Sequence, residues 1–325
     1  MRETSMLKVL VVGCGNIAGG FDAAASPTDP PRTHARAYQA HGQFSLEACV
    51  EPNTARRQAF MARWGVHRGY ASLHEVLDAQ EYFDVISVCS PTDAHYDDTR
   101  LALALGPRLV FCEKPVCDDL ALAEDLVARC RDHGTLLAVN HNRRWDPDLR
   151  RLREELAAGV WGALRSVSCL YNKGVLNNGS HLMDLLHDLL GPLSLLHTGE
   201  PVVDYSATDP SIPATLVTAT GVPVSLSCGH AADYSLFEVQ LVTQRGVIAM
   251  EDGGTRWRVR MAGASSQFQG YQALVDGDIL PGHYLQSMAN AVSNIYDAVV
   301  NGGALASNGD TALAAQRMCR LISKL

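Results

Sequence analysis

The stretch that decides the fold is LKVLVVGCGNIAGG, residues 7–20. Gly13 and Gly15 break an apolar run there, and a small residue follows three positions later, which gives the pattern G-x-G-x-x-A. When this pattern follows a strand and opens a helix, the first glycine permits the tight turn and the second leaves room for a pyrophosphate. The third small residue lets the helix approach the strand. We therefore predict a dinucleotide-binding turn made by Gly13, Gly15, Asn16, Ile17 and Ala18.

Short β-rich runs alternate with helical stretches as far as about residue 140. The predicted strands are residues 7–13, 44–51, 84–90, 108–113 and 135–140. Helices are expected between them, including 72–79 and 118–133, the second with Asp118 as its N-cap. Repeated strand, helix, strand units indicate a parallel sheet that is covered on both faces. The first half is thus predicted to be an α/β, doubly wound Rossmann domain.

The alternation of strand-like and helical segments ends after NHNRRWDP, residues 140–147. Asp146 and Pro147 there are typical of the N-cap and first position of a helix. We place the domain boundary there, with a dinucleotide-binding domain at 1–143 and an α+β substrate-binding and oligomerisation domain at 144–325. The second half contains strand-like runs that predict a largely antiparallel sheet with one open face. These runs are residues 164–171, 214–220, 222–229, 235–243, 246–252 and 255–263, followed by helices at 284–300 and 309–324.

The amino-acid composition of the chain limits the kinds of molecule that it is expected to bind. The chain has 325 residues, of which 47% are apolar, enough for two hydrophobic cores. A net charge of -8 and a pI near 5.8 argue against nucleic acid, because phosphate binding needs clustered Lys and Arg. The nine cysteines form no CxxC pair and lie mostly in apolar runs, which favours reduced core thiols in a cytoplasmic protein. We find no secretory signal and no apolar run long enough for a membrane span.

Glu51 ends the second predicted strand, where Rossmann domains carry the acid that binds the adenosine ribose. It lies further from the glycine turn than the usual spacing of about 20 residues. The Pro-rich segment 26–31 accounts for the excess. NAD is therefore the expected cofactor. Arg56 and Arg57 leave NADP possible, and Glu51 could instead be an exposed carboxylate before a turn.

Four segments, in order, carry a resemblance to a known family. They are GCGNIA (13–18), VCSPTDAH (88–95), FCEKP (111–115) and NNGSHLMDLL (177–186). Together they resemble the Gfo/Idh/MocA family of NAD(P)-dependent sugar and polyol oxidoreductases. The resemblance implies a Rossmann domain plus an open-faced sheet domain, with the substrate held over the nicotinamide.

Carried over residue by residue, the resemblance assigns a cofactor side and a catalytic lysine. It implies that the cofactor is lined by Ser90, Pro91, His95, Glu113 and Lys114. Lys114 ends an apolar strand at the carboxyl edge of a parallel sheet, where open α/β folds bind ligands, although a solvated charge is the ordinary alternative. Relatives tend to have a cis peptide bond before the proline, so we expect Lys114-Pro115 to be cis.

His181 is the second candidate for proton transfer, because a base must lie within about 3 Å of the reacting hydroxyl. Two other interpretations are a helix cap or buried core group, and a metal site with Asp184, His187 and Asp188. At 100° per residue, positions 181 and 187 lie far apart around a helix, so we predict no metal.

The family's commonest form has an aspartate four residues before this histidine, and here Asn177 stands in its place. An asparagine can orient an imidazole but does not stabilise its charged form, which gives Lys114 more of the proton transfer. Alternatively, Asn177 binds a substrate hydroxyl, as Asn178 beside it could. Arg144 and Lys173 are further candidates for substrate binding, and each could equally be a surface charge.

The predicted function is hydride transfer between nicotinamide and a secondary alcohol or ketone of a sugar, polyol or nucleotide-linked sugar. A catalytically silent dinucleotide-binding sensor or scaffold is the alternative. A metal-dependent hydrolase built around His181 lacks a ligand set and leaves the glycine turn unexplained. Because an open sheet face often pairs with another copy, a homo-oligomer, dimer or tetramer, is expected.

Overall fold

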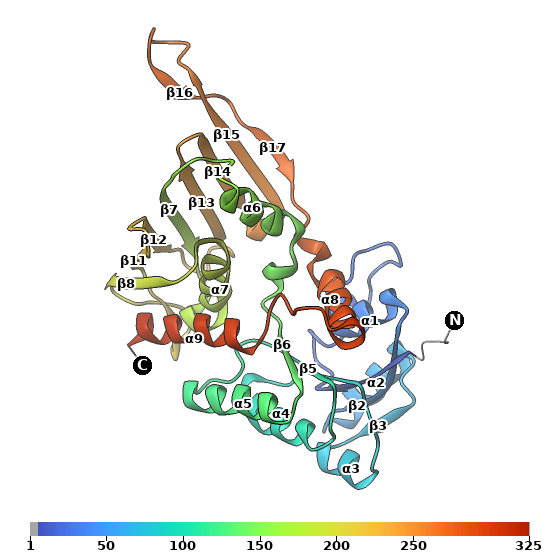
Figure 1. Ribbon diagram of the computed structural model, residues 1–325. Helices are drawn as coiled ribbons and strands as arrows, with labels where there is room; N and C mark the ends of the chain where they lie inside the picture. The colour runs from blue at the N-terminus through green and yellow to red at the C-terminus, as the bar shows by residue number, and fades with distance from the viewer. Residues whose placement is uncertain (1–5, 325) are drawn as a thin grey trace. The chain divides into compact units, whose positions relative to one another are not determined.

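The computed structural model describes residues 6–324, which divide into two compact units (Figure 1). The first runs as far as Trp145 and includes Leu285–Leu313, and the second consists of Asp146–Tyr284 and the residues from Ala314 onwards. This differs from the expected division at residues 143 and 144, because the chain returns to the first unit near its end. The returning helix α8 (Ser287–Asn301) packs against α1 (His34–His41) through buried apolar residues.

Within the described residues the first unit contains a six-stranded sheet in the order β3-β2-β1-β4-β5-β6. All of its neighbouring pairs run parallel, which confirms the predicted doubly wound sheet. The strands are β1 (Leu7–Val12), β2 (Phe44–Val50), β3 (Arg68–Tyr70), β4 (Val85–Val88), β5 (Leu109–Cys112) and β6 (Leu136–Val139). The carboxyl ends of β1 and β4, where the strand order reverses, are the position at which such sheets bind ligands.

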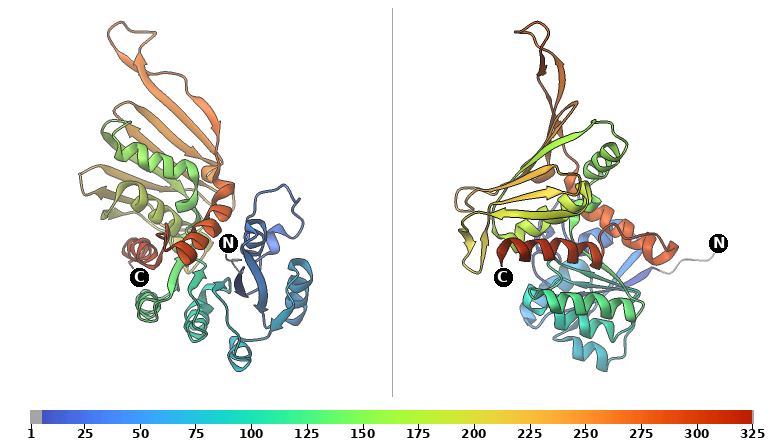
Figure 2. Two further views of the ribbon diagram at one scale, coloured as in Figure 1. Left: turned by 45° about the vertical axis from the view of Figure 1, so that its right-hand side comes forward. Right: turned by 60° about the vertical axis from the view of Figure 1, so that its left-hand side comes forward.

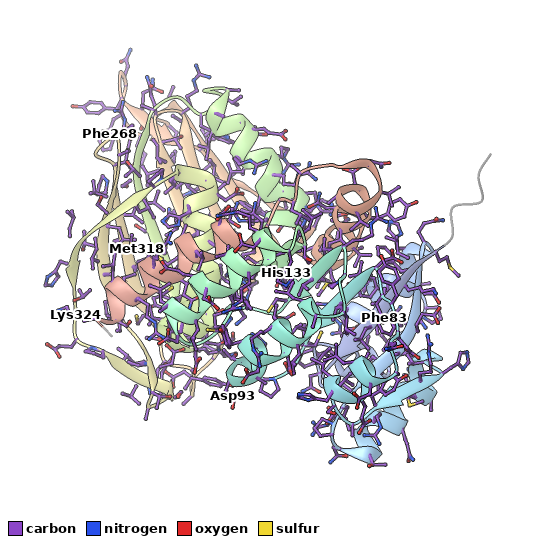
Figure 3. The ribbon with its side chains drawn as sticks, turned by 60° about the horizontal axis from the view of Figure 1, so that its bottom comes forward. Phe83, Asp93, His133, Phe268, Met318 and Lys324 are labelled. Atoms are coloured by element: carbon purple, nitrogen blue, oxygen red, sulfur yellow. The ribbon has the colours of Figure 1, made fainter. Side chains whose placement is uncertain are left out.

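Helices cover both faces of this sheet, so its strands are buried on both sides. Val9 and Val11 of β1 belong to the cluster that includes α1, α8 and α2 (Thr54–Trp64). The alternate residues Leu10 and Val12 pack with Phe83 and with α3 (Leu73–Asp78) and α4 (His95–Leu103). Phe83, labelled in Figure 3, is fully buried. Helix α5 (Leu120–Asp132) covers β5 and β6.

The helix expected directly after the glycine turn is interrupted, which corrects that prediction. The N–H of Gly19 bonds to the Gly15 carbonyl at 3.2 Å, and the chain then leaves the helical path through η1 (Gly20–Asp22) and a proline-rich loop. Proline cannot continue a helix because it lacks an N–H and clashes with the preceding turn. Helix α1 resumes only at His34, where the N–H groups of His34 and Ala35 bond to the carbonyls of Ile17 and Ala18 at 3.2 and 2.9 Å.

Residues 20–33 form a loop between the glycine turn and α1, which we call the excursion. The buried carboxylate of Asp22 holds its two ends together. Asp22 is fully buried and accepts hydrogen bonds from the main-chain N–H groups of Arg32 at 2.8 Å and Thr33 at 2.9 Å. It also accepts from the Thr33 hydroxyl at 2.8 Å and from Arg32 Nε at 3.1 Å. Burial alone would raise the pKa of Asp22, but the hydrogen bonds from Thr33 and Arg32 outweigh it and lower the pKa.

The second unit is built on a nine-stranded sheet within the described residues, in the order β16-β15-β14-β13-β7-β12-β11-β8, with β17 paired to β15. Strands β7 and β12 run parallel and the other neighbours antiparallel. The strands are β7 (Leu164–Tyr171), β8 (Leu193–Thr198), β11 (Ala214–Thr218), β12 (Pro223–Cys228), β13 (Phe237–Thr243), β14 (Gly246–Glu251), β15 (Arg256–Ala264), β16 (Gln272–Leu274) and β17 (Asp278–Pro281). A separate two-stranded ribbon joins β9 (Val202–Ser206) to β10 (Asp209–Ser211).

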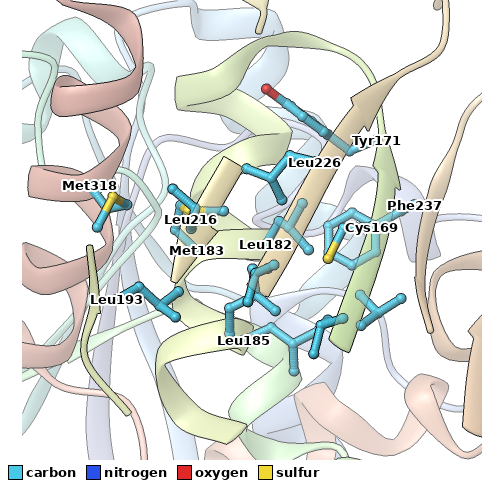
Figure 4. Packing of buried hydrophobic residues seen from close by; sticks show 14 of the residues in the cluster. Cys169, Tyr171, Leu182, Met183, Leu185, Leu193, Leu216, Leu226, Phe237 and Met318 are labelled. Atoms are coloured by element: carbon cyan, nitrogen blue, oxygen red, sulfur yellow. The ribbon is translucent and has the colours of Figure 1, made fainter. Parts of the chain in front are cut away.

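Helices cover one face of this larger sheet. Figure 2 shows α6 (Pro147–Ala157) and α7 (Gly179–Leu190) against it, and the later part of α9 (Gly309–Ser323) joins the same core. Figure 4 shows that core, in which Leu182 and Met183 of α7 pack on strand residues such as Cys169. On the opposite face Leu170 is exposed, so the predicted open-faced sheet is confirmed. Figure 3 also labels the exposed Phe268, between β15 and β16.

The remaining short helices are η2 (Thr92–Ala94), η3 (Asn142–Trp145), the π-helical turn η4 (Gly174–Asn178), η5 (Asp252–Gly254) and η6 (Tyr284–Gln286). Among residues 6–324, no helix is both long enough and apolar enough to cross a membrane.

Candidate active site

The turn after β1 has the shape that a dinucleotide needs. Gly13 has a φ of +84°, and a Cβ there would lie 2.7 Å from the main-chain nitrogen of Ser90, so a glycine is required where β1 and β4 end side by side. At Gly15, by contrast, a Cβ would meet nothing within 4 Å. The open space beside Gly15 fits a pyrophosphate that approaches the main chain.

Glu51 lies beside this turn at the end of β2. Its side chain is buried and accepts hydrogen bonds from the N–H groups of Cys14 at 3.2 Å and Asn53 at 3.0 Å. Arg56 Nη1 is 3.4 Å from the same carboxylate. The alternative of an exposed carboxylate is therefore wrong, and the acid occupies the position that suits a ribose 2′-hydroxyl.

His95 joins the turn after β4 to the turn after β5. The ring is buried, with Nε2 2.9 Å from the Ser90 carbonyl oxygen and Nδ1 2.8 Å from that of Pro115. The Lys114-Pro115 peptide bond is cis, as predicted. Both ring nitrogens face main-chain oxygens, so His95 holds the two turns together, and Ser90 and Pro91 lie in the first of them.

Glu113 and Lys114 follow β5 at the carboxyl edge of the sheet, and both are partly buried. The Glu113 carboxylate accepts hydrogen bonds from Asn140 Nδ2 at 2.6 Å and from His34 Nε2 at 3.0 Å. Burial alone would raise the pKa of Glu113, but the bonds from His34 and Asn140 and the charge of Lys114 outweigh it and lower the pKa. Glu113 therefore carries a negative charge beside the lysine.

His141 is a buried neighbour of this pair. Burial, together with the positive charges of Lys114 and Arg144, lowers the pKa of His141 to about 3. The ring is thus neutral at physiological pH and adds no charge to the site. Sequence reasoning missed His34, Asn140 and His141, because their neighbours in sequence form no recognised motif and only the sheet topology brings them to Glu113.

Arg144 is buried rather than a surface charge, and its Nη1 lies 3.4 Å from the Ala306 carbonyl oxygen. It belongs to the first unit, with the glycine turn, Glu51 and Lys114. Lys173, Asn177, Asn178 and His181 belong to the second.

In the second unit, Asp209 of β10 binds the start of the helical segment that carries His181. Its carboxylate accepts from the N–H groups of Leu176 at 2.8 Å and Asn177 at 2.9 Å, as an anion at a helix N-terminus should. Gly174 has a φ of +86°, and a Cβ there would lie 2.1 Å from the Asp209 carboxylate. The π-helical turn η4 leads directly into α7. Asn177 in η4 is four residues before His181 in α7, and residues four apart lie on the same face of a helix.

A second loop lies at this end of the large sheet. Asn172 is fully buried and donates to the Tyr234 carbonyl at 2.6 Å, while its Oδ1 accepts from the Leu236 N–H at 3.0 Å. The main-chain N–H of Lys173 donates to Asp204 at 2.8 Å. Asn172, the residue before Lys173, therefore holds the main chain of the exposed Tyr234, a contact that the sequence did not indicate.

The metal interpretation finds no support around His181. Asp188 forms an ion pair with Arg153 at 3.0 Å. Across residues 6–324, no group of three His, Cys, Asp or Glu side chains is arranged to hold a metal ion.

Residues 7–141 match a family described as an oxidoreductase family with an NAD-binding Rossmann fold. Over 305 residues the chain is 24% identical to an inositol 2-dehydrogenase from Rhizobium meliloti (strain 1021), covering 87% of this chain and 90% of that protein.

Two solved structures are similar over almost the whole chain. An oxidoreductase from Agrobacterium radiobacter in complex with NAD+, L-tartaric acid and magnesium has a TM-score of 0.78 at 17% identity, covering 98% of this chain and 96% of that one. A 3-ketoreductase from Actinomadura kijaniata in complex with NADP has a TM-score of 0.76 at 21% identity, covering 98% and 97%. At these identities the likeness shows a shared fold.

Proposed function

Since this chain belongs to the Gfo/Idh/MocA family of NAD-binding oxidoreductases, we propose that it transfers a hydride between NAD and a secondary alcohol or ketone of a polyol, a sugar or a nucleotide-linked sugar. The observation that carries the proposal is the carboxyl edge of the parallel sheet, where the open turn at Gly15, the buried Glu51 and the Glu113–Lys114 pair meet. The first unit is proposed to bind the dinucleotide, and the second is proposed to supply most of the substrate contacts.

The residues of the first unit fit the cofactor. The turn at Gly13 and Gly15 holds the pyrophosphate, and Glu51 accepts from the ribose 2′-hydroxyl. When bound, the nicotinamide supplies the hydride acceptor or donor, and the protein supplies placement and proton transfer.

Alcohol oxidation also releases a proton from the hydroxyl, so the site needs a base. Lys114 and His181 are the proposed proton-transfer residues. Because an amide at position 177 orients an imidazole without stabilising its charged form, Lys114 carries the larger share.

Recognition of a polyhydroxylated substrate needs side chains that donate and accept hydrogen bonds. Asn177, Asn178, Lys173 and Arg144 are the proposed contacts. Tyr234 extends the set, because Asn172 holds its main chain and its exposed aromatic ring offers an apolar surface to a sugar ring. The inositol 2-dehydrogenase from Rhizobium meliloti supports the polyol class.

We also propose an oligomeric state and a cellular location for the protein. The open face of the large sheet is proposed to pair with another copy, which light scattering of the purified protein can test. Within residues 6–324 the nine cysteines form no disulfide, which supports the proposal of a reducing, cytoplasmic location.

The test is NADH binding followed by turnover on a panel of inositols, sugars and nucleotide-linked sugars. NADH binding with NAD-dependent oxidation of at least one panel member, lost in Lys114→Met, supports the proposal. Tight NADH binding without turnover of any member supports the silent sensor or scaffold.

A further inference from the structure

A chain of buried hydrogen bonds reaches Glu113 from inside the first unit. Tyr38, Ser87 and His34 are all fully buried. The Tyr38 hydroxyl lies 2.7 Å from Ser87 Oγ, which lies 3.2 Å from His34 Nδ1. His34 Nε2 in turn lies 3.0 Å from Glu113 Oε1. The His34 ring also packs on Phe111, with ring centroids 4.4 Å apart.

The direction of donation along this chain follows from its two ends. Ionised Glu113 only accepts, so Nε2 of His34 carries a proton. A neutral ring then accepts from Ser87 at Nδ1, and Ser87 accepts from the Tyr38 hydroxyl, so every group has a partner. In the alternative, a doubly protonated ring donates from Nδ1 to Ser87, whose oxygen can accept from both His34 and Tyr38, and the Ser87 hydroxyl proton then has no acceptor within this chain of hydrogen bonds. The neutral ring with its proton on Nε2 therefore satisfies the whole chain.

Asn140 holds the same carboxylate from the neighbouring strand. Asn140 is buried at the end of β6, and its Nδ2 donates to Glu113 Oε1 at 2.6 Å. One oxygen of Glu113 thus accepts from α1 and from the end of β6. The main chain of Glu113 is also fixed, because its N–H donates to the Val88 carbonyl at 2.9 Å.

We propose that His34 and Asn140 are positioning residues for the active site: they hold the Glu113 carboxylate and thereby fix the neighbouring Lys114. The inference rests on the proposed role of Lys114. Since Tyr38 and Ser87 are fully buried, the chain ends inside the core and offers no route for a proton to solvent. The chain therefore orients the carboxylate and does not deliver protons.

The pH dependence of the rate can test the positioning role of His34, because few of the groups around Glu113 change charge near pH 7. Burial raises the pKa of the Cys89 and Cys112 thiols above their ordinary value, and burial with Lys114 nearby lowers that of His141 to about 3. These three groups stay neutral near pH 7. The other titratable groups at Glu113 are His34 and Lys114. Removal of the His34 donor should raise the pKa of Glu113, so that activity is lost at a higher pH on the acidic side.

The experiment compares His34→Phe, His34→Gln and Tyr38→Phe in the full-length protein. His34→Phe keeps an aromatic ring on Phe111 but loses the donor. Its kcat should fall about 10- to 100-fold, the scale of a small misplacement of a reacting group. The acidic limb of its rate profile should move upward while the NADH dissociation constant changes much less. His34→Gln keeps an N–H donor and should restore part of kcat.

Tyr38→Phe is the matched control, because it removes a buried hydroxyl at the far end of the chain. It should lower the melting temperature and leave kcat close to that of wild type. Asn140→Asp tests the other side of the carboxylate: two carboxylates in contact cannot both ionise, so the acidic limb should again move upward. His34→Phe with wild-type kcat and pH profile overturns the inference. An equal loss of kcat in Tyr38→Phe does so too, because the cluster would then act only through stability.

A measurement without substrate separates this inference from the proposed function. Nitrogen NMR of labelled histidine side chains should contain one neutral ring protonated on Nε2 that disappears in His34→Phe, and a His34 ring protonated on Nδ1 overturns the inference. If wild-type protein turns over no substrate, the proposed function fails, while the His34 tautomer still reports on the hydrogen bond to Glu113. If wild type is active and Lys114→Met is not, the function stands whatever His34→Phe does.

Discussion

The main-chain N–H of Cys14 donates to the Glu51 carboxylate at 3.2 Å, so the residue between the two motif glycines and the acid at the end of β2 are held together. A carboxylate fixed there would accept from a ribose 2′-hydroxyl and repel a 2′-phosphate. We predict that NADH binds more tightly than NADPH. Glu51→Gln should weaken NADH binding by about 10- to 100-fold, from the about 1.5–3 kcal/mol of a hydrogen bond to a charged group. Fluorescence titration with both nucleotides measures this.

Arg56 provides the control for this preference, because its side chain is 58% exposed and only 3.4 Å from Glu51. Arg56→Ala should leave NADH binding nearly unchanged and weaken any residual NADPH binding, since an arginine there can pair with the phosphate. Equal or tighter binding of NADPH by the wild-type protein contradicts the prediction.

The two glycines of the turn should respond differently to alanine. Gly13→Ala forces a Cβ to within 2.7 Å of the Ser90 nitrogen at a φ of +84°, so we expect a loss of stability of about 1–3 kcal/mol. Gly15→Ala meets nothing within 4 Å and should melt like the wild type, yet its methyl group occupies the space proposed for the pyrophosphate and should weaken NADH binding. Melting temperatures measure the stability of both variants, and NADH titrations measure their affinity for the cofactor. A Gly15→Ala protein with wild-type affinity would mean that the pyrophosphate lies elsewhere.

Asn177→Asp tests the partner of His181. An aspartate stabilises imidazolium, so a higher pH is needed to free the base and the acidic limb of alcohol oxidation should move upward. If Asn177 instead donates to a substrate hydroxyl, the aspartate removes that donor and raises KM with little change in the pH profile. Rate profiles of kcat and kcat/KM against pH separate the two roles.

Two further variants complete that comparison. Asn178→Asp adds the same charge one residue further along the helix, where it faces a different direction, and should shift the acidic limb less. Lys114→Met should abolish turnover and still bind NADH. Normal turnover in Lys114→Met, with an unchanged profile in Asn177→Asp, would show that the active site has been placed wrongly.

Asp22 should make stability depend on pH. Its folded pKa is lowered, so its contribution is present above the unfolded value of about 3.9 and is lost as the pH falls through the folded value. Asp22→Asn should destabilise the protein by about 1–3 kcal/mol at pH 7, because an amide NH₂ faces donors where an oxygen accepted. The gap between the variant and wild type should narrow below pH 4. Urea unfolding at several pH values measures it, and a gap that does not vary with pH counts against the carboxylate's role.

Much of the fold could be predicted because local chemistry and tertiary structure agree. Asp146 caps α6 and Pro147 begins it, as predicted, and the buried strands β4 and β5 lie within the predicted runs. The N-cap of helix α5 lies one residue later than expected, at Asp119 rather than Asp118. Short strands such as β3, only three residues long, were missed because they carry too few residues to show a period.

The positions of candidate site residues were predictable where they depend only on the end of the residue's own strand. Glu51 and Lys114 follow apolar runs, and the sequence pattern alone assigns them to one edge of the sheet. His34 and Asn140 were not predictable, because they meet Glu113 only through the order of β4, β5 and β6 and through the delayed start of α1. The return of α8 to the first unit was likewise hidden, because its apolar face does not reveal which core it joins.

The hydrogen bonds that His34 and Ala35 make to Ile17 and Ala18 bring the two ends of the 20–33 excursion together. The register of β1 and β2 therefore does not depend on the length of the excursion. We expect a shorter or foreign segment between Ala18 and His34 to keep that register, and to lower stability unless it replaces the hydrogen bonds of Asp22 and the bond from Arg63 Nε to the Ala23 carbonyl at 2.9 Å. Variation among relatives at this point would then alter what surrounds the nucleotide while the scaffold beneath it stays the same.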